Sequence, residues 1–153
     1  MVSLSYAPAT LYAGYMTAGI GNNVVINGNF TDKMNAVTPW GASGITLGSG
    51  TYTITIGSNA GMYSNGNITG AGGLAYLGTA STSSVNLGGS CTYTGPTTFN
   101  GNGFAMSATV GGKLGVAGSV INVINGAILT GYGTVNGNLN VTNATITSGN
   151  AAT

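Results

Sequence analysis

The chain has 153 residues, and three of them carry a charged side chain: Asp32, Lys33 and Lys113. It has no histidine, one cysteine and a formal net charge of +1. This composition excludes most enzymes, because general acid–base catalysis needs histidine or paired carboxylates. It also excludes transition-metal sites built from such residues and nucleic-acid binding, which needs a basic surface. We therefore expect a non-enzymatic protein with no cofactor, no nucleic-acid partner and no small-molecule substrate.

The N-terminal segment, residues 1–22, is uncharged and rich in apolar residues. Pro8, Gly14 and Gly19 interrupt it, so it lacks the roughly 20 consecutive apolar residues of a transmembrane helix. We predict that this segment forms an extended N-terminal arm or cap. Such an arm either closes one end of the protein or adds as a strand to a neighbouring subunit. The candidate assembly residues in this arm are Val2, Leu4, Tyr6, Leu11, Tyr12 and Tyr15.

Residues 23–153 are expected to form the body of the protein, and they predict strands. Glu, Arg and Gln, which favour helices, are absent, and glycine occurs 29 times along the chain. Short segments alternate polar and apolar residues with a period of two, and Asn-Gly or Gly-Gly dipeptides lie between many of them. The predicted strands are Val24–Ile26, Thr51–Ile56, Ser84–Leu87, Thr97–Asn100, Val120–Ile124, Asn138–Thr142 and Ala144–Thr147.

Two architectures fit short strands with dense turns: hairpins in a sandwich, or the coils of a parallel β-solenoid. Asn-Gly between strands normally indicates a hairpin. However, residues 120–131, 133–142 and 143–149 repeat one theme, which favours a solenoid with roughly 20 residues per coil. Stacked coils would also let Asn and Thr side chains form ladders along the axis. The residues expected to point inward are Ile54, Ile56, Leu87, Leu114, Val123, Leu129, Leu139 and Ile146.

Three motifs carry a resemblance to a known family. Residues 66–74 read Gly-Asn-Ile-Thr-Gly-Ala-Gly-Gly-Leu, residues 92–98 read Thr-Tyr-Thr-Gly-Pro-Thr-Thr, and residues 126–137 read Gly-Ala-Ile-Leu-Thr-Gly-Tyr-Gly-Thr-Val-Asn-Gly. With these motifs, residues 57–150 resemble the passenger-associated transport repeat of bacterial autotransporters. The chain departs from the family at Ala75, where lysine is usual, and at Cys91, where asparagine is usual. We expect the chain to lack the translocator barrel of an autotransporter.

The resemblance implies an all-β, right-handed parallel β-helix that is secreted and exposed at the cell surface. Combined with the segment before it, the expected fold is a β-solenoid body of residues 23–153 that follows an extended N-terminal arm. Because this inference comes from a family pattern, it predicts the fold more directly than the function.

A few residues carry weaker signals. Asp32 and Lys33 are expected in a turn, with both charges in water. Cys91 is expected as a small buried hydrophobe, and a bridge between subunits is the alternative. Thr-x-Thr occurs at 51/53/55, 92/94 and 145/147. Ranked threonines of this kind suggest an ice- or surface-binding face, although threonine is also a common strand residue.

The composition and the expected fold together predict a structural protein that is extracellular or at the cell surface. Natural proteins guard exposed strand edges with charges, and this chain has almost none. We therefore expect a homopolymer: a subunit of a filament, sheath or surface layer that assembles by end-to-end β-stacking, by strand addition through the arm, or by both. An adhesin-like autotransporter passenger fragment is the alternative, and an ice- or surface-binding solenoid is a lower one. Cell-surface or matrix polysaccharide is a further candidate partner.

Overall fold

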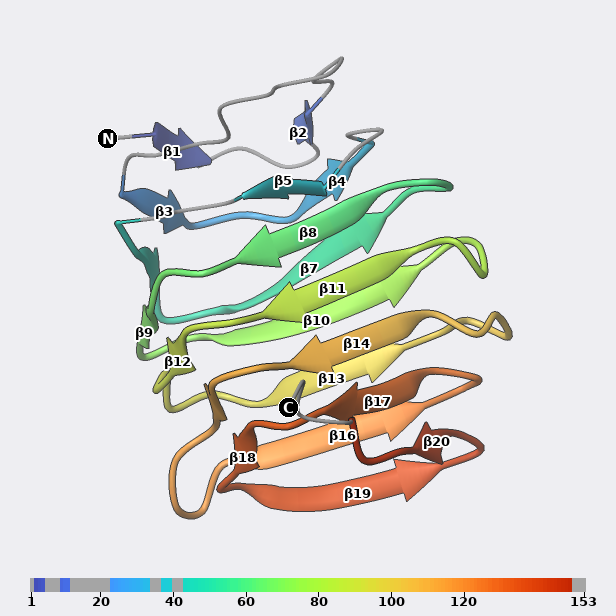
Figure 1. The fold of residues 1–153 in the computed structure, drawn as a ribbon. Helices are drawn as coiled ribbons and strands as arrows, with labels where there is room; N and C mark the ends of the chain where they lie inside the picture. Colours follow the sequence, from blue (N-terminus) through green and yellow to red (C-terminus); the bar gives the residue numbers. More distant parts are fainter. Residues whose placement is uncertain (1, 5–8, 12–22, 34–36, 40–42, 150–153) are drawn as a thin grey trace.

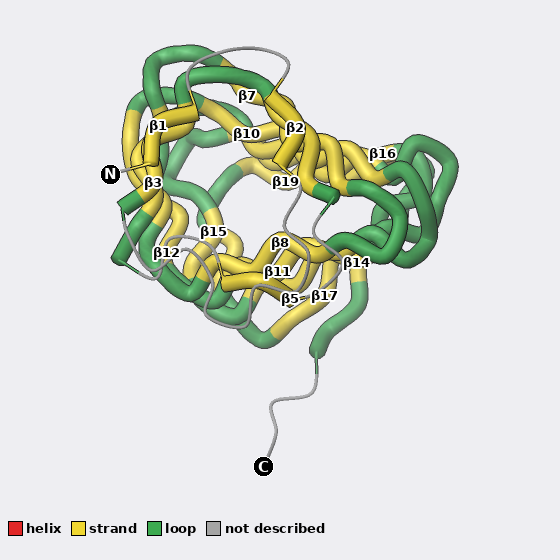
Figure 2. The backbone as a smooth tube through the Cα atoms, turned by 90° about the horizontal axis from the view of Figure 1, so that it is seen from above, coloured by secondary structure: helices red, strands yellow, loops and turns green. Residues whose placement is uncertain are grey.

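The chain folds as a parallel β-solenoid, as predicted (Figure 1). The computed structural model describes residues 2–4, 9–11, 23–33, 37–39 and 43–149, and all of its paired strands run parallel. The described residues contain no helix, and so none that is long and apolar enough to cross a membrane. The strands belong to three sheets that surround a common interior when viewed along the solenoid axis (Figure 2).

Each of the three sheets is a stack of strands, one from each successive coil. Sheet 1 contains β1 (Val2–Leu4), β3 (Val24–Ile26), β6 (Ile45–Leu47), β9 (Ile68–Gly70), β12 (Ser90–Cys91), β15 (Lys113–Leu114) and β18 (Thr134–Val135). Sheet 2 contains β2 (Ala9–Leu11), β4 (Phe30–Asp32), β7 (Thr51–Ile56), β10 (Gly73–Gly78), β13 (Thr97–Asn100), β16 (Val120–Ile124) and β19 (Asn138–Thr142). Sheet 3 contains β5 (Val37–Pro39), β8 (Gly61–Ser64), β11 (Ser84–Leu87), β14 (Ser107–Val110), β17 (Ile128–Gly131) and β20 (Thr145–Ile146).

Successive strands of a sheet pair in register about one coil apart in the sequence. Leu74 pairs with Tyr52 of the preceding coil and with Thr97 of the following coil. The coil shortens near the C-terminal end, where Ile121 pairs with Leu139. These spacings agree with the expected coil of roughly 20 residues. We call a set of three consecutive strands, one from each sheet, a rung.

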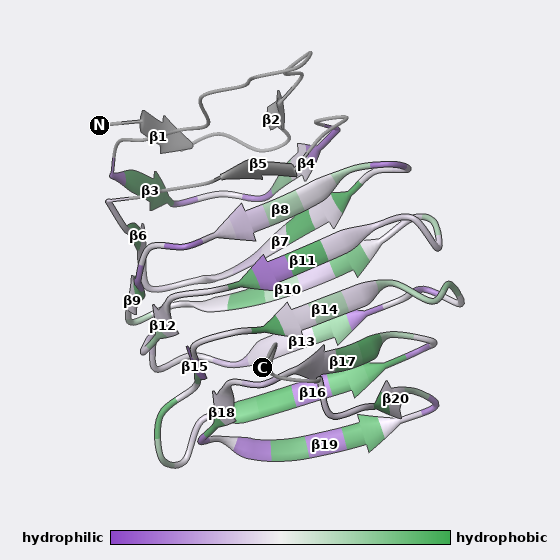
Figure 3. Cartoon of the chain, in the orientation of Figure 1, coloured by the Kyte–Doolittle hydropathy of each residue, from purple (hydrophilic) through white to green (hydrophobic). Residues whose placement is uncertain are grey.

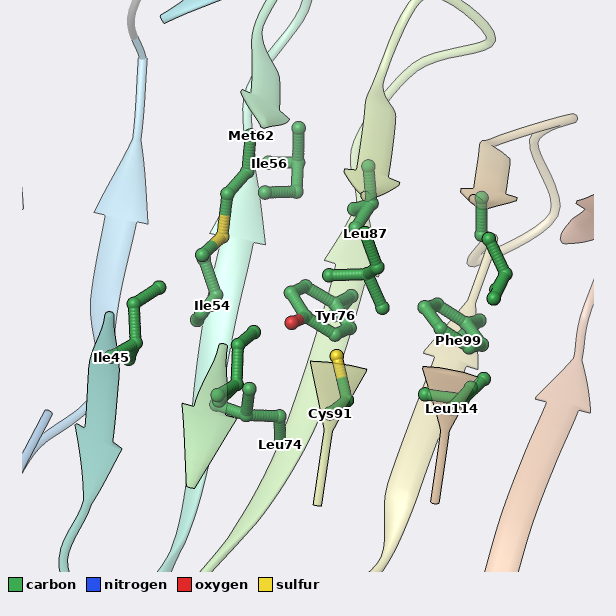
Figure 4. Close-up of a cluster of buried hydrophobic side chains, with 14 of the residues drawn as sticks. Ile45, Ile54, Ile56, Met62, Leu74, Tyr76, Leu87, Cys91, Phe99 and Leu114 are labelled. Atoms are coloured by element: carbon green, nitrogen blue, oxygen red, sulfur yellow. The ribbon is translucent and has the colours of Figure 1, made fainter. Parts of the chain in front are cut away.

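The register stacks like residues over like residues and so builds the core. Inward-facing positions form columns along the axis, and their members are at most 3% exposed in the rungs before the last. The side chains of several columns meet in the interior, where the rings of Tyr76 and Phe99 stack with their centroids 5.3 Å apart (Figure 4). Column members are Val24, Ile45, Ile68, Cys91 and Leu114 from sheet 1, Phe30, Ile54, Tyr76, Phe99 and Val123 from sheet 2, and Met62, Val85, Ala108 and Leu129 from sheet 3.

The corners between sheets 2 and 3 explain the Asn-rich turns of the sequence. Asn59, Asn102, Asn125 and Asn143 have positive φ, and each lies between a strand of sheet 2 and the next strand of sheet 3. Asparagine tolerates this left-handed conformation better than most residues. The Asn-Gly dipeptides at 102 and 125 are therefore turns, but they join strands of different sheets instead of making hairpins.

The N-terminal segments continue two of the sheets. β1 pairs with β3, and β2 pairs with β4, both in parallel. Tyr6, Tyr12 and Tyr15 of the expected arm lie outside the described residues. The proposed roles of the arm and of its residues, Val2, Leu4 and Leu11 included, stay predictions.

Candidate functional site

The C-terminal end of the described solenoid presents an open cross-section. β18, β19 and β20, which we call the C-terminal rung, are the outermost strands of their sheets at this end. Polar and apolar residues alternate along β19 (Figure 3). The apolar residues at the inward positions of the C-terminal rung pair with buried residues of the rung before. These residues are Val135, Leu139, Val141 and Ile146, which are 37%, 40%, 45% and 45% exposed. The interior of the described solenoid is therefore exposed to solvent here.

This open end corrects two of the expected core residues. Ile54, Ile56, Leu87, Leu114, Val123 and Leu129 are buried, as predicted. Leu139 and Ile146 are not, although they pair with the buried Ile121 and Leu129 and so share their columns. The alternation of the sequence identifies the inward face of a strand, but burial also requires a rung on both sides.

The open end also presents unguarded strand edges. No described strand lies beyond β18, β19 or β20 in its sheet. Outer strand edges carry backbone N–H and C=O groups ready to pair with another chain, and natural proteins discourage such pairing with charged side chains. Residues 132–149 contain no charged residue. The C-terminal rung thus combines free strand edges, exposed apolar side chains and an absence of charged residues.

A hollow of about 250 Å³ lies at this end, beside sheet 3. Its walls include Val110, Leu129, Val135, Leu139 and Ile146. At its wall the column of Ser64, Leu87 and Val110 continues with Gly131. Gly131 cannot be replaced by a larger residue, since its φ is +131° and an added Cβ would collide with the carbonyl oxygen of Val110.

The outer face of sheet 2 carries a polar ladder, which the sequence pattern predicted. Asn122 Nδ2 donates to Thr98 Oγ1 at 3.3 Å, and Asn140 Nδ2 donates to Asn122 Oδ1 at 3.1 Å. Of the three Thr-x-Thr segments, the first lies in sheet 2, where Thr53 shares a column with Thr98 and Asn122, and the other two lie elsewhere. Residues 51/53/55 lie in β7, 92/94 lie between β12 and β13, and 145/147 begin in β20 of sheet 3. The structure therefore does not bring these threonines into one array.

A cluster of polar side chains is buried within the core. Tyr93 Oη and Thr97 Oγ1 share a hydrogen bond of 2.6 Å, and both residues are 1% exposed. Burial raises the pKa of the Cys91 thiol to about 12. Burial, reinforced by neighbouring ionisable groups, also raises the pKa of Tyr76 and of Tyr93. All three groups are therefore neutral near pH 7, and the expectation that Cys91 is a buried hydrophobe is confirmed.

Tyr76 and Tyr93 differ in hydrogen bonding, and this difference predicts opposite effects of removing their hydroxyl groups. The buried hydroxyl of Tyr76 has no hydrogen-bond partner among the described residues. Because a buried unsatisfied group costs about 1–3 kcal/mol, Tyr76→Phe should raise the free energy of unfolding by about 1 kcal/mol. Tyr93→Phe should lower it by a similar amount, since it deprives Thr97 of its partner. Urea denaturation measures the free energy of unfolding of both variants. Equal losses of stability would contradict the assignment of an unpaired hydroxyl to Tyr76.

Asp32 is not in a solvated turn, and that expectation was wrong. It is the last residue of β4 and is 0% exposed, at the position that pairs with the inward-facing Ile56. Lys33, which follows the strand, is exposed. Successive side chains along an extended chain point to opposite faces, so Asp32 points inward and Lys33 points toward solvent.

Sequence reasoning located some features of the open end and missed others. It identified the lack of charged guards and the exposed edges of a solenoid. It did not identify the hollow, because its walls come from strands of all three sheets that are brought together only by the fold. Comparisons of the chain with protein-family models, with curated proteins and with solved structures find no match.

Proposed function

We propose that the protein is a structural subunit of an extracellular filament, sheath or surface layer, and that it assembles with itself by end-to-end β-stacking. The observation that carries the proposal is the C-terminal rung, whose inward residues Val135, Leu139, Val141 and Ile146 are 37–45% exposed. Exposed apolar surface that continues a buried core marks an interaction site. A second solenoid end would bury these residues and pair the free strand edges in one step.

The neutrality of the subunit supports the same proposal. With three charged side chains in 153 residues, copies of the chain repel one another very little. The C-terminal rung adds no charge of its own, since its inward residues are apolar and residues 132–149 carry no charged side chain. The arm residues Val2, Leu4, Tyr6, Leu11, Tyr12 and Tyr15 offer a second route, strand addition to a neighbour.

The fold also favours one alternative. A parallel solenoid is the fold implied by the resemblance to autotransporter passengers, so an adhesin-like passenger fragment at the cell surface is the second candidate function. Its candidate partner is a surface or matrix polysaccharide, which the uncharged Asn and Thr ladder of sheet 2 would contact through hydrogen bonds. Dispersed subunits that bind cells or polysaccharide would favour this alternative over the filament.

A charge placed on the inner side of the C-terminal rung should prevent stacking. We expect Val141→Lys to raise the critical concentration for assembly by at least about tenfold, because stacking would bury an unpaired charge. In the free subunit the lysine can reach water, since Val141 is 45% exposed. Sedimentation and negative-stain electron microscopy measure assembly, and circular dichroism shows that the variant is folded.

Thr142→Lys is the matched control, because the neighbouring residue of the same strand points outward and is also exposed. It adds the same charge to the same rung and should leave assembly unchanged. Filaments from Val141→Lys at the wild-type concentration would overturn stacking through this end. Leu4→Lys and Leu11→Lys in the same assay test the arm route separately.

A further inference from the structure

We propose that Asn136 is a site of spontaneous modification, at which the side-chain amide becomes a carboxylate through a cyclic imide. Asn-Gly occurs six times in the sequence, and Asn136-Gly137 is the pair that joins β18 to β19 in the C-terminal rung. Asparagine followed by glycine is especially open to this reaction, because glycine places no side chain beside the reacting backbone nitrogen. The six sites differ in whether that nitrogen and the asparagine side chain are already held in place.

The nucleophile of the reaction is the backbone nitrogen of Gly137, which gives up its proton to attack. It attacks Cγ of Asn136, so that a carbon–nitrogen bond forms and the side-chain nitrogen leaves as ammonia. Water then opens the imide ring at either of its two carbonyl carbons. The product is aspartate, or isoaspartate, in which the backbone runs through the former side-chain carbon. Water is the only reactant consumed, and the new carboxylic acid gives its proton to the ammonia.

The backbone around Asn136 leaves the reacting nitrogen available. Asn136 N donates a hydrogen bond to the carbonyl oxygen of Leu114 at 2.9 Å. Asn138 N donates to the carbonyl oxygen of Ser119 at 2.7 Å. Between these two anchors, the Gly137 nitrogen donates to no acceptor among the described residues. The Asn136 side chain is exposed, so it can rotate toward this nitrogen without displacing the core.

At three of the other Asn-Gly sites, the nitrogen that follows the asparagine is hydrogen-bonded. The bond must open before the nitrogen can give up its proton, just as it must open for hydrogen exchange. The three bonds run from Gly101 N to Ile124 O at 3.1 Å, from Gly103 N to Asn125 O at 2.8 Å and from Gly126 N to Asn143 O at 2.7 Å. The asparagines that precede these glycines should therefore react slowly.

At the remaining two sites, the asparagine side chain lies against the next coil. An added Cβ at Gly48 would collide with Oδ1 of Asn27, and an added Cβ at Gly88 would collide with Oδ1 of Asn65. These contacts restrict the rotation that the attack requires. β18 is the outermost described strand of sheet 1 at the C-terminal end, so no described coil lies beyond Asn136 to hold its side chain.

The modification would place a charge at an edge that has none. Residues 132–149 contain no charged residue, and charged side chains discourage the pairing of strand edges. Isoaspartate also adds a backbone atom between β18 and β19, which disturbs the register of the outermost strands. Modified subunits should therefore assemble less well. This effect on assembly rests on the proposed function, whereas the modification itself does not.

Incubation of the unassembled subunit at mildly alkaline pH, followed by peptide mass spectrometry, measures the modification at each asparagine. We expect Asn136 to react at least about fivefold faster than Asn102, which is equally exposed but precedes the hydrogen-bonded Gly103. The rate should rise with pH, since the attacking nitrogen must give up its proton. In urea-unfolded protein the two sites should react at similar rates. Equal rates in the folded subunit, or an unmodified Asn136, would overturn the proposal.

Two variants separate this inference from the proposed function. Asn136→Gln keeps an amide but forms the larger imide ring poorly, so it should resist modification and assemble like fresh wild-type protein after incubation. Asn136→Asp carries the carboxylate from the start and should raise the critical concentration for assembly by about fivefold, because pairing the edge would desolvate the charge. If Asn136→Asp assembles like wild type, the effect on assembly is refuted. If wild-type protein never assembles, the proposed function fails, and the rate comparison still decides the modification. Circular dichroism confirms that each variant is folded.

Discussion

Replacing Leu87 by alanine should lower the free energy of unfolding by about 2–5 kcal/mol, the usual cost of deleting a buried leucine side chain. Leu87 is 1% exposed and lies in the middle of the solenoid, where it pairs with Ser64 on one side and Val110 on the other. Its neighbours belong to three different rungs, so they cannot collapse around the missing atoms without disturbing the register. Urea denaturation of the unassembled subunit measures the loss.

Leu139→Ala is the matched comparison, because it deletes the same atoms from an inward position of the C-terminal rung. Leu139 is 40% exposed, so the change should cost the free subunit less than about 1 kcal/mol. In assembled protein the same side chain would be buried, and the variant should therefore weaken assembly more than folding. Equal destabilisation of the two free subunits would show that the C-terminal rung is already covered in the monomer.

The sequence predicted several strands with the bounds that the structure shows, but it missed β10 (Gly73–Gly78), which is as long as β7. The expected strands Thr51–Ile56, Ser84–Leu87 and Val120–Ile124 have the same bounds in the structure. Alternation with a period of two is visible only where polar residues occupy the outward positions, and residues 74–77 of β10 are apolar throughout. In sheet 1, Val24–Ile26 was predicted, but Ser90–Cys91 and Lys113–Leu114 have only two residues each. Their glycine-rich surroundings resemble turns, and only the parallel pairing in the structure identifies them.

Local turn signals alone would have given the wrong architecture. Asn102-Gly103 and Asn125-Gly126 have the sequence of hairpin turns, yet both join parallel-paired strands of different sheets. What these two turns share with a hairpin turn is a positive φ at asparagine. The choice between hairpin and solenoid came from the repeat of residues 120–149 and from the family resemblance, which are long-range signals.

The candidate site was predictable in its chemistry but not in its position. The absence of charges near the C-terminal end is visible in the sequence, and it correctly indicated unguarded edges. Which side chains are exposed depends on the register that pairs Leu139 with Ile121 and Ile146 with Leu129. The alternation pattern gives inward residues the same signature in every rung. It therefore cannot distinguish a buried column member from one at the open end.

A glycine in the middle of the solenoid should tolerate substitution far less than a glycine at an exposed corner. Gly70 has a φ of +120°, and a Cβ at this position would collide with the carbonyl oxygen of Leu47 in the preceding rung. The Cβ atom is bonded to the backbone and the carbonyl oxygen is part of it, so neither can rotate away. The collision would therefore push apart β6 and β9, two paired strands of sheet 1. We expect Gly70→Ala to lower the free energy of unfolding by about 3 kcal/mol or more, from backbone strain and lost pairing together.

Gly103→Ala separates backbone strain from collision. Gly103 also has a positive φ, +87°, but an added Cβ would have no atom within 4 Å. Gly103→Ala should lower the free energy of unfolding by about 1–2 kcal/mol, the cost of placing alanine in the left-handed conformation. It should leave the register of the strands intact. Urea denaturation with matched circular dichroism spectra compares the two. If both variants lost the same free energy of unfolding, the close approach of Leu47 would not be the reason that position 70 needs glycine. The close parallel pairing of β6 with β9 at this position would then be contradicted.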